Sequence, residues 1–298
     1  MKREFPAQVD SAQVPGVSIG LPVFNGAHFL AQALDSLLAQ TFGDFELIIS
    51  DNASTDETAA ICADYIGRDQ RIRYFRQQTN IGAPRNWSFV VTVARGRYFK
   101  WASGNDLCAP DMIERYVTTL AAQPQAVLCY GRTCLVDEDT GQEERYDHDF
   151  SVDDARPSDR FSHLLRSMRL NNAQSGLIRL DVLRQTGLDR PYPAGDIPLM
   201  GELALRGKFV LLPEVLLFRR MGRTTFSRNL VGHAHADFYG SHSVSVVNGL
   251  RRHIDHAIGI LRTPIGMREK TRSFAHLARH AYWDMHGAWR SVRSTART

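Results

Sequence analysis

The chain has 298 residues, of which 43% are hydrophobic, and a formal net charge of +4. This is enough apolar material for a sizeable core, and no stretch approaches the ~18 consecutive apolar residues of a membrane span. The four cysteines form no C-x-x-C pair, and residues 1–15 contain no apolar h-region. We therefore expect reduced thiols, no signal peptide and a cytoplasmic protein.

The charge is distributed unevenly along the chain. Residues 219–298 carry 14 Lys and Arg against 4 Asp and Glu, whereas the remainder carries 22 against 28. Eight of the eleven histidines also lie in this tail. An acidic body joined to a basic tail predicts two parts with different partners. We expect an α/β domain at residues 1–231 and a basic helical extension at residues 232–298.

The first hundred residues alternate between predicted strands and helices. Strands are predicted at residues 17–24, 45–51 and 72–76 and in the segment that contains Trp101. Helices are predicted at residues 27–40, from a capping box of Ser54 and Glu57 to about residue 68, and from Pro84 to about residue 94. Four strand-to-helix units in succession predict a mostly parallel sheet with helices on both faces.

The pattern continues less regularly after residue 110. Strands are predicted at residues 126–136, 174–178, 209–213 and 215–219, and helices at residues 160–168 and 197–206. The long charged stretch at residues 137–159 is predicted to be a surface loop. We expect a nucleotide-binding half at about residues 16–110 and an acceptor-binding half at about residues 111–231.

Four polar motifs follow the predicted strands, where open α/β sheets bind ligands. They are Pro22-Val23-Phe24-Asn25-Gly26, Asp51-Asn52-Ala53-Ser54-Thr55-Asp56, Asn80-Ile81-Gly82 with Arg85-Asn86, and Gly104-Asn105-Asp106. Their order and spacing over residues 17–223 resemble the inverting glycosyltransferases of family 2. The resemblance implies the GT-A fold, with a Rossmann-like sheet, and a nucleotide-sugar donor. It further implies transfer from a UDP-sugar, or a dTDP-sugar, to a hydroxyl of a glycan, lipid-linked or small acceptor in surface polysaccharide synthesis.

The resemblance assigns seven residues to the nucleoside pocket: Pro22, Phe24, Asn25, Asp51, Asn80, Gly82 and Arg85. A fixed carboxylate at a strand end can accept a hydrogen bond from the N–H of uracil or thymine, which suits Asp51. The alternatives are structural. Asp51 and Asp56 can cap the next helix, Phe24 can belong to the core, and Arg85 can lie on an exposed helix surface.

The resemblance also implies a divalent cation, Mn²⁺ or Mg²⁺, at the segment that ends in Asp106. A cation that bridges the diphosphate oxygens disperses the charge that builds on the leaving group, and such cations need few carboxylates. The family usually has two acidic residues here, but this chain has Asn105 before Asp106. Asp106 is therefore the expected metal ligand, with Gly104 and Asn105 beside it in the donor site.

A second departure from the family lies in Arg219-Arg220-Met221-Gly222-Arg223, where Met221 replaces a histidine. A thioether is a poor ligand for a hard cation, whereas arginine binds phosphate well. We therefore predict weak metal binding, with Arg220 and Arg223 stabilising the diphosphate. The alternative is that these arginines only form a solvated basic edge of the protein.

An inverting transfer needs a general base for the acceptor hydroxyl. The family's base is an aspartate in a Glu-Asp block, and Asp196 matches that aspartate while Gly195 replaces the glutamate. Asp196 is the predicted catalytic base, although Asp is also a favoured helix N-cap. Asn171 and Asn172 precede Gly176, where the acceptor could approach closely.

The basic tail admits several partners. Leu250, Ile254, Ile258 and Leu261 form an apolar stripe beside arginines, which can bind an anionic membrane surface, the body of the protein or a second subunit in a homodimer. A membrane contact would place the protein at the inner face of the membrane. The tail histidines, such as His253 and His256, are predicted to lie on solvated helix faces rather than in a metal site. No nucleic-acid-binding motif accompanies the charge.

Two other functions compete with glycosyl transfer. A catalytically degenerate protein that binds nucleotide-sugars is favoured by the departures at Asn105, Gly195 and Met221. A nucleotidyltransferase would share the α/β sheet, but it would need a glycine-rich basic loop after the first strand, which residues 24–27 do not supply.

Overall fold

The computed structural model describes residues 14–222 and 247–295, and the side chains of the last helix up to residue 283. The strands are β1 (Val17–Val23), β2 (Phe45–Asp51), β3 (Ile72–Arg76), β4 (Tyr98–Trp101), β5 (Leu107–Cys108), β6 (Ala126–Asp137), β7 (Glu143–Arg145), β8 (Leu177–Arg179) and β9 (Lys208–Met221). The α-helices are α1 (Ala27–Leu38), α2 (Thr58–Arg68), α3 (Ala83–Val93), α4 (Met112–Ala122), α5 (Pro157–Ser167), α6 (Leu180–Leu183), α7 (Asp196–Arg206), α10 (Val247–Arg262) and α11 (Met267–Thr295). A 3-10 helix, η1, spans Asn172–Ser175.

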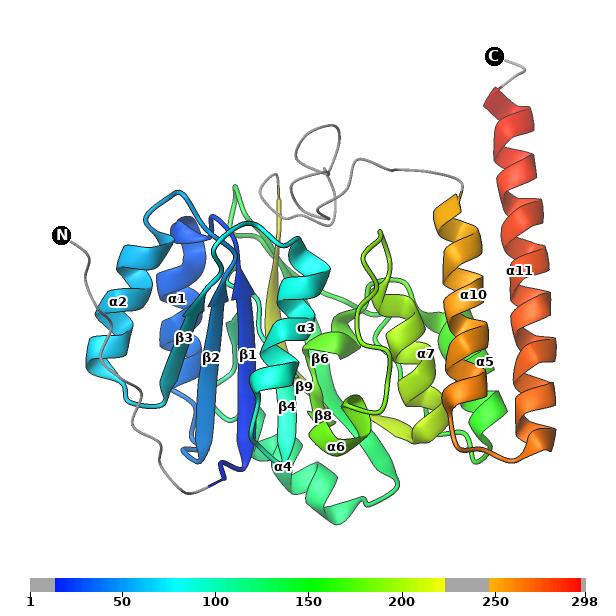
Figure 1. The fold of residues 1–298 in the computed structure, drawn as a ribbon, viewed down its shortest axis with the longest axis horizontal. Coiled ribbons are helices and arrows are strands. Elements are labelled where there is room, and N and C mark those ends of the chain that lie inside the picture. The colour runs from blue at the N-terminus through cyan, green and yellow to red at the C-terminus, as the bar shows by residue number, and fades with distance from the viewer. Residues whose placement is uncertain (1–13, 223–246, 296–298) are drawn as a thin grey trace.

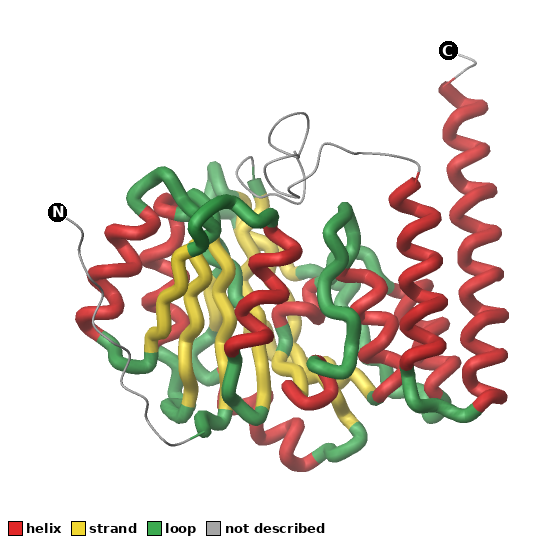
Figure 2. The backbone as a smooth tube through the Cα atoms, in the orientation of Figure 1, coloured by secondary structure: helices red, strands yellow, loops and turns green. Residues whose placement is uncertain are grey.

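All nine strands belong to one sheet with the order β3-β2-β1-β4-β8-β6-β9-β5, and β7 pairs with β6. The first four strands are parallel, as the alternation of strands and helices predicts. Beyond β4 the sheet is mixed, since β8 is antiparallel to both β4 and β6 while β6 and β9 are parallel. Figures 1 and 2 show α3 crossing the front of the sheet, with α10 and α11 side by side at the end of the molecule away from α2.

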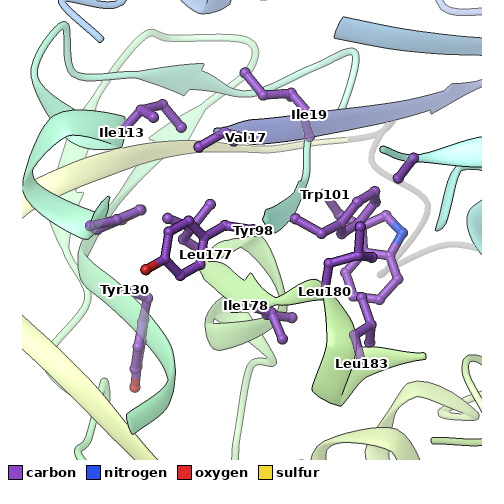
Figure 3. Packing of buried hydrophobic residues seen from close by; sticks show 14 of the residues in the cluster. Val17, Ile19, Tyr98, Trp101, Ile113, Tyr130, Leu177, Ile178, Leu180 and Leu183 are labelled. Carbon is purple, nitrogen blue, oxygen red and sulfur yellow. The ribbon is translucent and has the colours of Figure 1, made fainter. Parts of the chain in front are cut away.

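The core is continuous across the parallel and mixed parts of the sheet. Every residue of β1 and β2 is buried, because helices cover both faces. Gly20 lets α3 approach β1 closely, since a Cβ there would lie 2.7 Å from Val90. Figure 3 shows Tyr98 and Trp101 of β4 packing among aliphatic side chains of β1 and β8 and of α6, such as Leu180. This packing holds the ends of β1 and β4 rigidly at one edge.

Three local predictions are wrong. Helix α2 begins at Thr58 without a side-chain cap, because Ser54 accepts a hydrogen bond from the Asn25 backbone instead of capping the helix. The predicted strand at residues 174–178 is divided between η1 and β8. The predicted loop at residues 137–159 contains β7, and Val152 is fully buried where it pairs with Phe209.

The two C-terminal helices pack on the part of the body that contains α5 and α7. Helix α10 lies against α7, and α11 lies against α5 and α10 (Figure 1). The prediction of solvated histidines is wrong for His256, which is 2% exposed and packs edge-on against Phe161 of α5. Residues 232–246 of the predicted extension lie outside the described residues, so its boundary stays a prediction.

Across the described ranges 14–222 and 247–295, no helix combines the length and the apolar character needed to cross a bilayer.

Candidate functional site

The first part of the site is the loop after β2, which is held by Asp51. The carboxylate of Asp51 is fully buried, and it accepts hydrogen bonds from the Ser54 backbone N–H at 2.8 Å and from the Tyr74 hydroxyl at 2.7 Å. Arg76 lies 3.8 Å away. The carboxylate thus uses two hydrogen-bond acceptor sites to shape the loop. A carboxylate has about four such sites in all.

The loops after β1 and β2 are tied together by reciprocal hydrogen bonds. Asn25 has a φ of 47°, a left-handed conformation that asparagine tolerates, and its Oδ1 accepts from the Thr55 backbone N–H at 2.8 Å. Asp56 accepts from the backbone N–H groups of Ala27 and Thr58, both at 3.0 Å. Asp56 therefore holds the first residues of α1 and α2, as the structural alternative predicts.

A third loop joins this edge through the amide of Asn80. Asn52 Nδ2 donates to Asn80 Oδ1 at 2.7 Å, and the same oxygen accepts from the Gly82 backbone N–H at 2.8 Å. Gly82 has a φ of 81°, which favours glycine before α3. Pro22, at the end of β1, is buried, and Phe24, just after this strand, is half-buried.

Arg85 is exposed on α3 and lines a hollow of about 390 Å³. The opposite wall of this hollow includes Asp189 and Pro191 from the loop before α7. Ile81, Pro84 and Phe89 supply most of the remaining surface. The hollow is therefore lined both by α3 and the residues just before it and by the loop that leads to Asp196.

The end of β9 meets the segment after β4 at Asp106. The backbone N–H of Arg220 donates to Asp106 Oδ1 at 3.1 Å, and its guanidinium donates to the Asn105 carbonyl at 2.6 Å. The Arg220 guanidinium also lies 4.3 Å from the centre of the Phe29 ring. The structure brings Asn105, Asp106 and Arg220 together, whereas Arg223 lies outside the described residues.

Two opposing effects act on the pKa of Asp106. Burial raises the pKa of Asp106, while the positive charge of Arg219 and the Arg220 backbone N–H act against this rise. No cluster of three or more His, Cys, Asp or Glu occurs among the described residues. A single carboxylate fits a cation that is bound mainly by the substrate's phosphates, as Mg²⁺ often is, and does not fit a metal held by the protein alone.

The second part of the site is Asp196, the first residue of α7. Asn171 Nδ2 donates to Asp196 Oδ2 at 2.7 Å and contacts Gln174 Oε1 at 3.3 Å. Gln174 Nε2 in turn lies 3.2 Å from both oxygens of Asp189. The amides at η1 thus link two carboxylates from opposite ends of one loop.

Asp189 is the carboxylate that sequence reasoning missed. Burial and the neighbouring charge of Asp196 raise its pKa to about 8, while Gln174 and Arg190 act in the opposite direction. The residue lies in no recognised motif, so only the fold reveals it. The loop that carries Asp189 passes close to Gly195, since a Cβ at Gly195 would lie 2.3 Å from the Arg190 carbonyl oxygen. No glutamate can occupy position 195 without moving this loop.

Arg219 was also missed, although its neighbour Arg220 was predicted. Its guanidinium donates to Asn172 Oδ1 at 2.7 Å, and Asn172 donates to Asp149 Oδ1 at 3.0 Å. The buried Lys100 of β4 anchors the same helix by donating to the Ser175 carbonyl at 2.7 Å. Helix η1 therefore joins the Asp106 region to Asp196.

The loops after β1, β2 and β3 are hydrogen-bonded to one another, Asp106 lies near Arg219 and Arg220, and Asp196 is bonded to Asn171 beside η1. Together with the mixed sheet and the helices on both of its faces, these features define a GT-A type fold. Residues 18–180 match the family described as "Glycosyl transferase family 2". The chain therefore belongs to glycosyl transferase family 2. The matched range includes Asp51, Asp106 and Asn171 but ends before Asp196.

Relatives and solved structures agree with this family. An uncharacterized glycosyltransferase of Rickettsia bellii is 36% identical over 127 residues, which cover 42% of this chain and 18% of that protein. An uncharacterized protein of Mycobacterium bovis is 30% identical over 210 residues, which cover 66% of this chain and 56% of that protein. The chain thus spans only part of the length of these relatives.

Two solved structures have the same fold at low sequence identity. The Staphylococcus aureus protein TarS (residues 1–349), in complex with UDP-GlcNAc, aligns with a TM-score of 0.63 and 16% identity over 89% of this chain and 72% of that chain. The mannosyltransferase PcManGT of Pyrobaculum calidifontis, in complex with GDP-Man and Mn²⁺, aligns with a TM-score of 0.56 and 16% identity over 100% of this chain and 79% of that chain.

Proposed function

We propose that this protein is an inverting glycosyltransferase. It transfers a sugar from a nucleotide-sugar, with a UDP-sugar favoured and a dTDP-sugar the second choice, to a hydroxyl of a glycan, lipid-linked or small acceptor in surface polysaccharide synthesis. The observation that carries the proposal is the joining of Asp106 and Asp196 through Arg219, η1 and Asn171. These contacts support a leaving-group site at Asp106 and a base site at Asp196 that lie in one connected network.

In the proposed reaction, the acceptor oxygen attacks the anomeric carbon from the face opposite the nucleotide. Asp196 takes the proton of the acceptor hydroxyl as the new C–O bond forms, and the bond to the diphosphate oxygen breaks. The electron pair of that bond leaves with the nucleoside diphosphate. Asn171 holds the carboxylate of Asp196 in position through Oδ2, so that the other oxygen can face the acceptor.

The leaving group is stabilised at the end of β9. Arg219 and Arg220 bring positive charge to the Asp106 region, and arginine suits phosphate because its planar donors form paired hydrogen bonds. A bound Mn²⁺ or Mg²⁺, held by Asp106 and the diphosphate, would act as a Lewis acid on the leaving oxygens. Asn105 lies beside this position, and Gly104 precedes it. Arg223, outside the described residues, is proposed to contribute further charge.

The nucleoside is proposed to bind over the loops after β1 and β2. Asp51 retains acceptor capacity for a base N–H beyond its bonds to Ser54 and Tyr74. The surrounding pocket is assigned to the remaining predicted residues: Pro22, Phe24, Asn25, Asn80, Gly82 and Arg85. The hydrogen-bonded frame of these loops supports a pocket that is formed before the donor binds.

Asp189 is proposed to be a positioning residue in place of the family's glutamate. The backbone leaves no room for a side chain at Gly195, and Asp189 supplies a second carboxylate from the other end of the same loop. In its protonated form it can donate a hydrogen bond to the acceptor next to Asp196. In its charged form it repels the negative charge of Asp196.

The test is donor binding and hydrolysis across a panel of UDP-, dTDP- and GDP-sugars, with Mn²⁺ and with EDTA. The wild type is compared with Asp196→Asn, which keeps the size of the side chain but cannot act as a base. We expect one donor to be hydrolysed by the wild type only, while both proteins bind it. Binding without turnover by the wild type would be explained either by the missing acceptor or by a degenerate binding protein, and the absence of any binding would refute the proposal.

A further inference from the structure

Helix α10 is attached to the body through polar residues as well as through Ile260, which is fully buried in a cluster with Phe161 and Leu205. Asp255 accepts a hydrogen bond from Arg190 Nε at 3.0 Å and another from the Tyr192 hydroxyl. His256 is buried against Phe161, and burial lowers its pKa to about 3, so the ring is neutral at pH 7. The inward face of this helix therefore contains residues that soluble helices usually turn outward.

The contact between α10 and α7 also fixes the rotation of α10 about its axis. A Cβ at Gly259 would lie 2.6 Å from Glu202 Cγ, so the two helices approach closely. Glu202 is 1% exposed and accepts from Arg190 Nη2 at 3.2 Å and from Arg262 Nη1 at 3.4 Å. The outward face of α10 is consequently not free to turn toward the core.

That outward face contains four large aliphatic residues, which we call the apolar stripe. Their exposed fractions are 62% for Leu250, 50% for Ile254, 42% for Ile258 and 61% for Leu261. At about 100° per residue, their positions fall within a sector of roughly 80° on the helix. Scattered exposed aliphatic residues are normal, but a continuous stripe of this kind marks an interaction surface.

The flank of the apolar stripe is positively charged. Arg251 and Arg262 lie at the same side of the stripe, roughly 100–120° from Leu250 around the helix. Arg251 is exposed, and Arg262 is 42% exposed while its guanidinium also contacts Glu202. The acidic residue of α10, Asp255, is turned inward to Arg190. At the turn into α11, exposed Arg268 follows. Among the described side chains of α10, the outward face thus presents apolar and basic groups together.

We propose that the apolar stripe of α10 and its arginines bind the surface of an anionic lipid bilayer. The aliphatic side chains would enter the boundary between head groups and acyl chains, while the arginines contact the negatively charged head groups. The net positive charge of residues 219–298 adds long-range attraction to such a surface. The inference does not depend on which donor or acceptor the site uses.

A second copy of the chain is a poorer partner for this face. In an antiparallel pairing centred on the stripe, Arg251 of one copy would approach Arg262 of the other, since both arginines flank the same side. Like charges placed opposite each other across an interface are unfavourable. An anionic membrane satisfies both the apolar and the basic part of the surface.

The test is flotation of the full chain with phosphatidylcholine vesicles that contain or lack phosphatidylglycerol. We expect binding only with the anionic lipid, and weaker binding at high salt. The variant Ile254→Glu/Leu261→Glu should bind at least tenfold less tightly, since it places charge where apolar groups must enter. Val14→Glu, at another exposed aliphatic residue, is the matched control and should bind as the wild type does.

The charge is tested separately with Arg251→Gln, which should weaken binding about fivefold, as one basic residue at a membrane surface does. Arg145→Gln, on exposed β7, should have no effect. All substituted residues are exposed, so unchanged thermal unfolding should confirm folding. Equal binding to neutral vesicles, no binding to either, or a dimer that the Ile254→Glu/Leu261→Glu variant dissociates without vesicle binding would overturn the proposal.

Discussion

Asn171 Nδ2 donates a 2.7 Å hydrogen bond to Asp196 Oδ2 and so orients the proposed catalytic base. The next residue, Asn172, accepts from Arg219 on the opposite side of η1. Asn171 and η1, which begins at the next residue, therefore carry the side chains that contact Asp196 and Arg219. The strand that follows this helix, β8, lies between β4 and β6, and Lys100 ties the helix to the end of β4.

The first prediction concerns the hydrogen bond to the base. Asn171→Ala should lower kcat by up to about 100-fold with a small effect on donor binding, because a misplaced base costs rate rather than affinity. Asp196→Asn should cost about 10²-fold or more, as loss of a general base does. Single-turnover transfer and donor titration measure the two effects. Gln142→Ala, on an exposed turn, is the control, and an equal loss there would contradict the assignment.

The second prediction follows from the pKa of Asp189, which is raised to about 8. The folded protein binds this proton more tightly than the unfolded chain, so the associated stability is present at low pH and is lost as the pH rises through about 8. Asp189→Asn mimics the protonated form and should be more stable than the wild type at pH 9, with a smaller difference at pH 6. Urea unfolding at both values measures this.

The same substitution tests the role of Asp189 in the reaction. If ionised Asp189 repels the charge of Asp196, the pH–rate profile of the wild type should have an inflection near pH 8 that Asp189→Asn removes. Asp181→Asn, on an exposed side chain of α6, should leave the profile unchanged. A profile that is identical for wild type and Asp189→Asn would show that Asp189 has no part in proton transfer.

The third prediction compares two glycines of one helix. Gly259→Ala should lower the free energy of unfolding by about 1–3 kcal/mol, because its Cβ would lie 2.6 Å from Glu202 and would separate α10 from α7. Gly249→Ala has no atom within 4 Å and should raise stability by up to about 1 kcal/mol through helix propensity. Denaturant unfolding measures both. Equal effects at the two positions would contradict the close contact.

The strand ends were predictable because each depends on a short run of consecutive residues. The apolar run that ends in Asp51 predicts β2 to the residue, and the motif at Asn105 and Asp106 is brought beside Arg220 as expected. What the sequence could not show are pairings between distant residues. The partner of Arg219 lies 47 positions away, and Asp189 is defined only by the loop that folds it toward Gln174.

In the tail, too, the sequence could not show which distant residues come into contact. Its helical periodicity predicts the apolar stripe but not its surroundings, and the structure leaves Leu250 and Leu261 exposed rather than packed on the body. The pattern alone could not indicate that His256 is the residue turned inward, because burial of an imidazole depends on the shape of its neighbours. The space beside Gly201 and Phe161 decides this, since a Cβ at Gly201 would lie 2.8 Å from the His256 ring.

The last prediction concerns the metal. Asn105 stands where the family has a second carboxylate, and an amide is a weaker ligand for Mn²⁺ or Mg²⁺ than a carboxylate is. Asn105→Asp should therefore lower the Mn²⁺ concentration needed for half-maximal donor hydrolysis, about tenfold if one added ligand is worth roughly 1.4 kcal/mol. Asn105→Ala should leave that concentration close to the wild-type value. A Mn²⁺ requirement that Asn105→Asp leaves unchanged would show that residue 105 does not face the cation, and would leave Asp106 and the diphosphate as its ligands.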